Sequence, residues 1–157
     1  METNRRVVLV TSGSSPDRAI ALERLLTGVA DRAGWGPRLE IRLAGLDAGA
    51  GRITDAGLAA LKAHGIDAEG AVCPDLERRP ELLEKCHTVV CDHGDIADVL
   101  VDWDEAGDAE FVCVDELGDT PPPEDEDEHR DDPPIGDDVR DYEERIEEVL
   151  RLIIAQA

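Results

Sequence analysis

Apolar residues occur along the chain in two alternating patterns, short compact runs and longer stretches with helical spacing. Compact runs predict strands, and apolar residues three or four positions apart predict helices that bury one face. The expected strands are residues 6–11, 39–43, 88–92 and 111–114. The expected helices are residues 16–33, 54–65, 80–86, 96–101 and 138–153. Strands that alternate with helices predict an α/β fold, a three-layer sandwich with a central four-stranded parallel sheet.

The first expected strand leads into a loop of small and hydroxyl-bearing residues. Residues 7–10 are all apolar, Gly13 lies in the loop, and Pro16 suits the first turn of the following helix. In a strand, loop and helix arranged in this way, backbone N–H groups and the helix dipole point at one spot and favour an anion there. The candidate anion-binding residues are Ser12, Gly13, Ser14, Ser15 and Arg18.

The composition excludes several classes of partner. The formal net charge is −22, and aromatic residues make up 3% of the chain. This charge repels nucleic acids and anionic membranes, and base-stacking modules need more aromatic side chains. The sequence has no apolar run long enough to span a membrane and no signal-peptide pattern near Met1. We expect one cytoplasmic domain over residues 1–157 with no nucleic-acid or membrane partner, and the oligomeric state stays open.

Acidic residues are in large excess and gather in one stretch. The chain has 38 Asp and Glu against 16 Lys and Arg. Such a surplus destabilises a folded protein through self-repulsion unless salt screens it, which indicates an acidic, halophilic protein. The alternative is an ordinary protein with one acidic loop, because residues 124–132 are mostly acidic. Residues 118–133, which include three successive prolines, are expected to form this mobile acidic loop.

Salt is expected to raise the melting temperature steeply if the halophilic interpretation is right. The Debye length falls from about 30 Å at 0.01 M salt to about 3 Å at 1 M, so repulsion between surface carboxylates is largely removed over this range. Thermal melts followed by circular dichroism in increasing KCl measure the effect. A melting temperature that stays flat up to molar KCl would contradict the halophilic interpretation.

The order of the segments resembles the low-molecular-weight protein tyrosine phosphatase family, which includes thioredoxin-coupled arsenate reductases. The resemblance covers nearly the whole chain and rests on the order and spacing of its pieces. Val7–Gly13 is similar to the family's strand and phosphate loop, and Ala44-Gly45 to its Ser-Ala-Gly turn, with Leu43 in place of the serine. The other similar segments are Ile53–Asp67, Val89–Leu100, Asp132-Pro133 and Tyr142–Ile153. The resemblance implies a phosphotyrosine phosphatase I-like fold.

The family's chemistry uses a cysteine, five intervening residues and an arginine in the phosphate loop. The thiolate attacks phosphorus, the arginine clamps the phosphoryl oxygens, and an aspartate protonates the leaving group. Matching Gly13 to the family glycine puts Thr11 at the nucleophile position and Asp17 at the position of the arginine. Moving the match by one residue puts Ser12 at the nucleophile position and Arg18 at the position of the arginine. Both matches stay open.

Neither match supplies a cysteine. A hydroxyl has a far higher pKa than a thiol and needs an adjacent base, which the neighbouring sequence does not provide. The resemblance therefore implies a catalytically degenerate phosphatase-like protein, a pseudo-phosphatase without a cofactor. Its loop would bind phosphate or a phosphorylated protein or small molecule. The alternative is an active phosphatase or related oxyanion hydrolase in which Ser12 or Thr11 attacks, Arg18 clamps and Asp132 is the acid.

The cysteines of the chain lie outside this loop. Cys73 and Arg79 have the spacing of the family motif, but no clear strand precedes them and two acids lie between them, so the match is coincidental. Other residues have side chains of the types that bind zinc, namely Cys86, His87, Cys91 and His93. Cys91 instead fits a small packed residue inside a strand. We expect no metal site and, without a secretory context, no disulfide framework.

Overall fold

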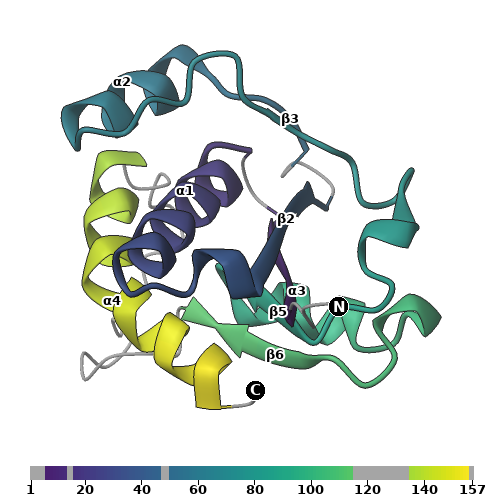
Figure 1. Cartoon of the computed structure of the whole chain (residues 1–157). Helices are drawn as coiled ribbons and strands as arrows, with labels where there is room; N and C mark the ends of the chain where they lie inside the picture. Colours follow the sequence, from purple (N-terminus) through teal and green to yellow (C-terminus); the bar gives the residue numbers. More distant parts are fainter. Residues whose placement is uncertain (1–5, 14–15, 47–49, 115–134, 156–157) are drawn as a thin grey trace, which may run out of the picture.

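The structure, a computed structural model, describes residues 6–13, 16–46, 50–114 and 135–155. Its centre is a four-stranded parallel sheet of order β2-β1-β5-β6 (Figure 1). The strands are β1 (Arg6–Ser12), β2 (Leu39–Gly45), β5 (Thr88–Cys91) and β6 (Glu110–Cys113). The predicted fold class and the positions of these strands are confirmed.

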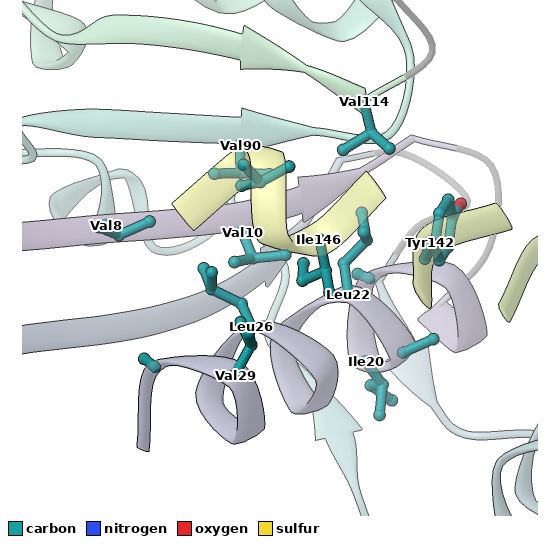
Figure 2. Packing of buried hydrophobic residues seen from close by; sticks show 14 of the residues in the cluster. Val8, Val10, Ile20, Leu22, Leu26, Val29, Val90, Val114, Tyr142 and Ile146 are labelled. Atoms are coloured by element: carbon teal, nitrogen blue, oxygen red, sulfur yellow. The ribbon is translucent and has the colours of Figure 1, made fainter. Parts of the chain in front are cut away.

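Helices cover both faces of the sheet. The α-helices of the described residues are α1 (Pro16–Arg32), α2 (Asp55–Ala63), α3 (Gly94–Leu100) and α4 (Ile135–Ala155). Helices α1 and α4 pack against each other and share one hydrophobic cluster with Val8 and Val10 (Figure 2). Helix α3 belongs to a second cluster, which contains Leu9 and Leu100. Because successive side chains of β1 point to opposite faces, the two clusters lie on either side of the sheet and give three layers.

Helix α1 follows the predicted amphipathic pattern and connects the site loop to the core. Its buried apolar face includes Ile20, Leu22 and Leu26, all fully enclosed. The helix ends where Gly34 adopts a φ of 81° and the N–H of Trp35 donates to the carbonyl of Ala30 at 2.8 Å. This arrangement satisfies the last carbonyls of a helix and favours glycine at the left-handed position.

The structure differs from the prediction in the segments beside β2 and before β5. A small antiparallel sheet joins β3 (Gly51–Arg52) to β4 (Val72–Cys73), where the sequence predicted only connecting segments. Such short strands leave no periodic signal in a sequence. The helix predicted over residues 80–86 is a 3₁₀ turn over Pro80–Leu82, held by hydrogen bonds between residues three apart. It stops before Lys85, whose φ of 63° cannot continue a right-handed helix.

Two further expectations concern the rest of the chain. The predicted acidic loop at residues 118–133 lies outside the described residues, so its mobility stays a prediction. No helix in the described ranges is both long and apolar enough to cross a membrane.

Candidate functional site

The candidate site lies where the carboxyl ends of β1 and β5 meet. From β1 the chain first continues to β2 on one side and then crosses to β5 on the other side of β1. The direction in which successive strands are added therefore reverses between β1 and β5. In open parallel sheets a crevice forms at such a reversal, outside the carboxyl ends of the strands, and ligands bind there. Strand β1 ends at Ser12, and the loop that begins with Gly13 leads to α1. The loop singled out from the sequence therefore opens at the position where this fold class holds ligands.

Thr11 and Ser12, the two candidate nucleophiles, have different surroundings. Both are fully buried. Thr11 pairs with Ala44 on one side and Cys91 on the other, and its hydroxyl has no hydrogen-bond partner among the described residues. Ser12 is the last residue of β1, and its hydroxyl donates to Oδ2 of Asp92 at 2.9 Å. Ser12 is therefore the hydroxyl with a base in contact.

Asp92 is the residue of this site that the sequence reasoning missed. The sequence next to the loop offers no base for a hydroxyl, but the fold brings a carboxylate to Ser12 from 80 residues away. Asp92 directly follows β5, and its N–H donates to the carbonyl of Thr11 at 3.3 Å. A signal was present in the sequence: an acid after a buried strand that neighbours β1 in a parallel sheet lies beside the end of β1.

Charge and burial act on the Asp92 carboxyl in opposite directions. Burial raises the pKa of Asp92 above its ordinary value of 3.8 and is the largest influence. The hydrogen bond from Ser12 and the positive charges of Arg18 and His93 lower this pKa in part, without cancelling the rise. Arg18 therefore acts electrostatically on the same carboxylate that Ser12 contacts. The Asp92 carboxyl gains a proton more readily than an exposed aspartate does.

Asp17 contacts the segment that begins α2. Its carboxylate accepts hydrogen bonds from the backbone N–H of Thr54 at 2.8 Å and from the Thr54 hydroxyl at 2.5 Å. Thr54 is the N-cap of α2, and its hydroxyl oxygen accepts from the N–H of Gly57 at 3.0 Å. The negative charge of Asp17 is thus held at the start of α2. Both matches of the loop to the family motif stay open, and the contacts of Asp17 with Thr54 favour the match through Ser12.

Gly13 lies against the side chain of Ile96 on α3. A Cβ atom on Gly13 would overlap the Cδ1 atom of Ile96, so the end of that flexible side chain would have to move to make room. Of the other predicted anion-binding residues, Ser14 and Ser15 lie outside the described residues, as does the candidate acid Asp132.

Three of the cysteines outside the loop, Cys73, Cys86 and Cys91, are buried, and Cys113 is partly exposed. Burial, with a smaller contribution from Glu23, raises the pKa of the Cys73 thiol to about 12, so it is not a thiolate near neutral pH. Cys91 is fully enclosed in the second hydrophobic cluster, as predicted for a packed residue of a strand. Within the described residues no group of three or more potential metal ligands lies close together.

Several solved structures have a fold similar to that of this chain. The structure matches YfkJ from Bacillus subtilis with a TM-score of 0.70 and 14% identity, over 97% of this chain and 96% of that chain. A low-molecular-weight protein tyrosine phosphatase from T. tengcongensis matches with a TM-score of 0.68 and 17% identity, over 93% of this chain and 98% of that chain. The chain has the fold of the low-molecular-weight protein tyrosine phosphatases.

A third solved structure also has this fold. It is a YwlE arginine phosphatase mutant with a phosphorylated active-site serine. It matches with a TM-score of 0.60 and 19% identity, over 94% of this chain and 90% of that chain. No family model matches the sequence, and no curated protein does either. The predicted fold is therefore confirmed through structure, although the identities are low.

Proposed function

We propose that this protein binds phosphate or a phosphorylated partner at the β1–α1 loop and does not turn it over as a cysteine phosphatase does. The observation that carries the proposal is the contact between Ser12 and Asp92 at the end of β1, where the charge of Arg18 also acts. The Ser12 hydroxyl donates a hydrogen bond to the Asp92 carboxylate, and Arg18 acts on the same carboxylate through its charge. A hydroxyl and a guanidinium group that stabilise a carboxylate oxygen can also stabilise the oxygens of a phosphoryl group bound beside them.

The raised pKa of Asp92 favours such binding. A neutral carboxyl does not repel a phosphate, and burial moves Asp92 toward its neutral form. We therefore expect phosphate to bind more tightly as the pH falls through the pKa of Asp92, where the carboxyl becomes protonated. The match to a YwlE mutant with a phosphorylated active-site serine supports the presence of a phosphoryl group next to a serine in this fold.

We expect the protein to be catalytically degenerate because its loop offers a hydroxyl where the family has a thiol. A thiolate attacks phosphorus readily and is also a good leaving group when water cleaves the intermediate. A serine hydroxyl must first lose its proton, and it leaves poorly from phosphorus as an alkoxide. We expect no sustained release of nitrophenolate from para-nitrophenyl phosphate by the unmodified protein.

Replacing Arg18 by alanine is expected to abolish stabilisation by phosphate. A ligand present at a hundred times its dissociation constant stabilises a protein by about 2.7 kcal/mol, which raises the melting temperature by several degrees. Arg18→Ala removes the positive charge beside the site and should lose most of this shift. Melting curves with and without saturating inorganic phosphate, at constant ionic strength, measure it.

Arg24→Ala is the matched control, because Arg24 also lies on α1 and pairs with Glu23. It should keep the full phosphate shift. An unmodified protein whose melting temperature does not respond to phosphate would contradict the proposed function.

The alternative is an active oxyanion hydrolase that uses Ser12 or Thr11 with Arg18 and Asp132. The hydrogen bond between Ser12 and Asp92 favours Ser12 in that role, since it provides the base that a hydroxyl nucleophile needs. Sustained turnover of para-nitrophenyl phosphate that disappears in Arg18→Ala would establish the hydrolase and exclude the degenerate interpretation.

A further inference from the structure

We propose that Cys91 and Cys113 form a reversible disulfide when the protein meets a peroxide, and that this bond displaces Asp92 from its contact with Ser12. The two cysteines are the last residues of the neighbouring strands β5 and β6. The inference assigns a redox modification site and the part of the candidate site on which it acts. Its effect on phosphate binding rests on the proposed function, whereas formation of the disulfide does not.

The register of the sheet places the two cysteines side by side. Cys91 and Cys113 are partners in the parallel pairing of β5 with β6, and both are thiols in the structure. Neighbouring strands of a sheet lie about 4.7–4.9 Å apart, and the Cα atoms joined by a disulfide lie about 4.4–6.8 Å apart. The backbone of this pair therefore has a spacing that a disulfide can span.

The two side chains also point to the same face of the sheet. Side chains alternate between the two faces along a strand. Val90 and Val112 belong to the hydrophobic cluster that α1 and α4 share, so the residue after each of them points to the opposite face. Cys91 accordingly belongs to the second cluster, together with Leu100 of α3. Shared register and shared face bring the two sulfur atoms to the same side of the sheet.

Exposure gives the two cysteines different parts in the reaction. Cys91 is fully buried, whereas Cys113 is partly exposed on β6 at the edge of the four-stranded sheet. A peroxide in solution therefore meets Cys113 first. Cys73 and Cys86 are buried, and burial is the main cause that raises the pKa of each of these two thiols. Because the thiolate is the form that is oxidised, they compete poorly.

The step balances with hydrogen peroxide as the oxidant. The Cys113 thiolate attacks one peroxide oxygen, the O–O bond breaks, and Cys113 becomes a sulfenic acid while the released hydroxide takes up the thiol proton as water. The Cys91 sulfur then attacks the Cys113 sulfur. The S–S bond forms, the S–O bond breaks, and a second water leaves with the Cys91 proton. The two thiols lose two electrons and two protons, and the peroxide is reduced to water.

The disulfide acts on the site through Asp92, which directly follows Cys91. The Cβ atoms of a disulfide lie about 3.5–4.5 Å apart, less than the strand spacing of about 4.7–4.9 Å. The bond therefore draws the end of β5 toward β6 and away from β1. The Asp92 N–H donates to the Thr11 carbonyl at 3.3 Å, and its carboxylate accepts from Ser12 at 2.9 Å. Both contacts should lengthen, and the strain makes the disulfide easy to reduce.

The experiment treats the full chain with hydrogen peroxide and identifies the product by peptide mass spectrometry. The unmodified protein should lose two of its four thiols and the mass of two hydrogen atoms, with the peptides of Cys91 and Cys113 joined. Dithiothreitol should restore both thiols. Cys113→Ser should form no disulfide within the chain. Cys86→Ser is the matched control, because Cys86 is a buried cysteine of the same cluster, and it should form the disulfide as the unmodified protein does.

Backbone NMR of the unmodified protein measures the effect on the site without any phosphate. The amide signal of Asp92 should shift on oxidation, its hydrogen exchange should become faster, and both changes should reverse with dithiothreitol. Cys113→Ser given the same treatment should keep its Asp92 signal. The rise in melting temperature caused by inorganic phosphate should become smaller in the oxidised protein and recover on reduction.

The outcomes separate this inference from the proposed function. Oxidation of Cys113 alone, a disulfide between two chains, or a linkage between other cysteines would overturn the proposed pair. A disulfide between Cys91 and Cys113 that leaves the Asp92 signal unchanged would overturn its action on the site. A reduced protein that does not respond to phosphate would contradict the proposed function, while the joined peptides and the shifted Asp92 signal would still establish the redox site.

Discussion

Replacing Ser12 by cysteine is expected to convert the protein into an enzyme with sustained phosphatase turnover. The change restores the spacing of cysteine, five residues and arginine with Arg18 in the last position. A thiol has a lower pKa than a hydroxyl, attacks as a thiolate and leaves readily from phosphorus, so both half-reactions become feasible. Continuous release of nitrophenolate from para-nitrophenyl phosphate should exceed that of the unmodified protein by at least about a hundredfold.

Asp92 should limit the gain. An ionised carboxylate next to the introduced thiol disfavours the thiolate and raises its pKa. Adding Asp92→Asn to Ser12→Cys is therefore expected to increase turnover further. An increase would distinguish a charge that disfavours the thiolate from a residue that only stabilises the loop.

Thr11→Cys is the matched control for the position of the nucleophile. Thr11 lies inside β1 between Ala44 and Cys91, and Asp17, six residues later, is bound to Thr54. We expect a thiol at position 11 to give no turnover. Turnover in Thr11→Cys without turnover in Ser12→Cys would show that the other match of the loop is the functional one.

The sheet and its helices were predictable because their signals are local. The continuous apolar run before Ser12, the helical spacing of the residues that include Leu22 and Leu26, and the stripe along α4 each reflect burial of one segment. Gly65, with its φ of 79°, follows α2 as predicted for a residue after a helix end. The antiparallel pair β3 and β4 escaped prediction because its strands, Gly51–Arg52 and Val72–Cys73, are too short to show a period.

The site was predictable only in part because it combines distant segments. The candidate loop residues Ser12, Gly13 and Arg18 lie close together in the sequence, which is why the sequence singles them out. Asp92 meets Ser12 through the position of β5 beside β1, and strand order is not encoded in any one segment. In the same way, the partner of Asp17 lies at the start of α2. Acids next to the ends of predicted strands and helices are therefore worth testing as pairs once a fold is assigned.

Asp17→Ala is expected to lower the stability of the folded protein by about 3 kcal/mol. The Asp17 carboxylate is buried, at 6% exposure, and accepts from both the backbone N–H and the hydroxyl of Thr54. Hydrogen bonds to charged groups contribute about 1.5–3 kcal/mol each, and their removal leaves the Thr54 N–H without an acceptor. For a chain of this size the melting temperature should fall by about 6–12 °C. Thermal and urea unfolding measure the loss.

Asp31→Ala is the matched control, because Asp31 lies on the same helix but is exposed, so its removal should change stability by less than about 0.5 kcal/mol. Gly57→Ala should also lower the stability of the folded protein, because a Cβ atom on Gly57 would overlap the Asp17 carboxyl group and disturb its contact with Thr54. Combining Asp17→Ala with Thr54→Ala should cost less than the sum of the two single effects, because both remove one shared interaction. Full additivity would contradict the link between α1 and α2.

Phosphate binding separates this structural role from a role in the site. If Asp17 faced the bound anion, as the match through Thr11 requires, its removal would relieve repulsion and tighten phosphate binding severalfold. If Asp17 is committed to Thr54, Asp17→Asn should leave the phosphate-induced shift in melting temperature unchanged while lowering the melting temperature itself. The hydrogen bonds from Thr54 favour the second outcome. Within the described residues, the carboxylate that contacts the Ser12 hydroxyl is that of Asp92, so Asp92→Asn, and not Asp17→Asn, should alter the phosphate-induced shift.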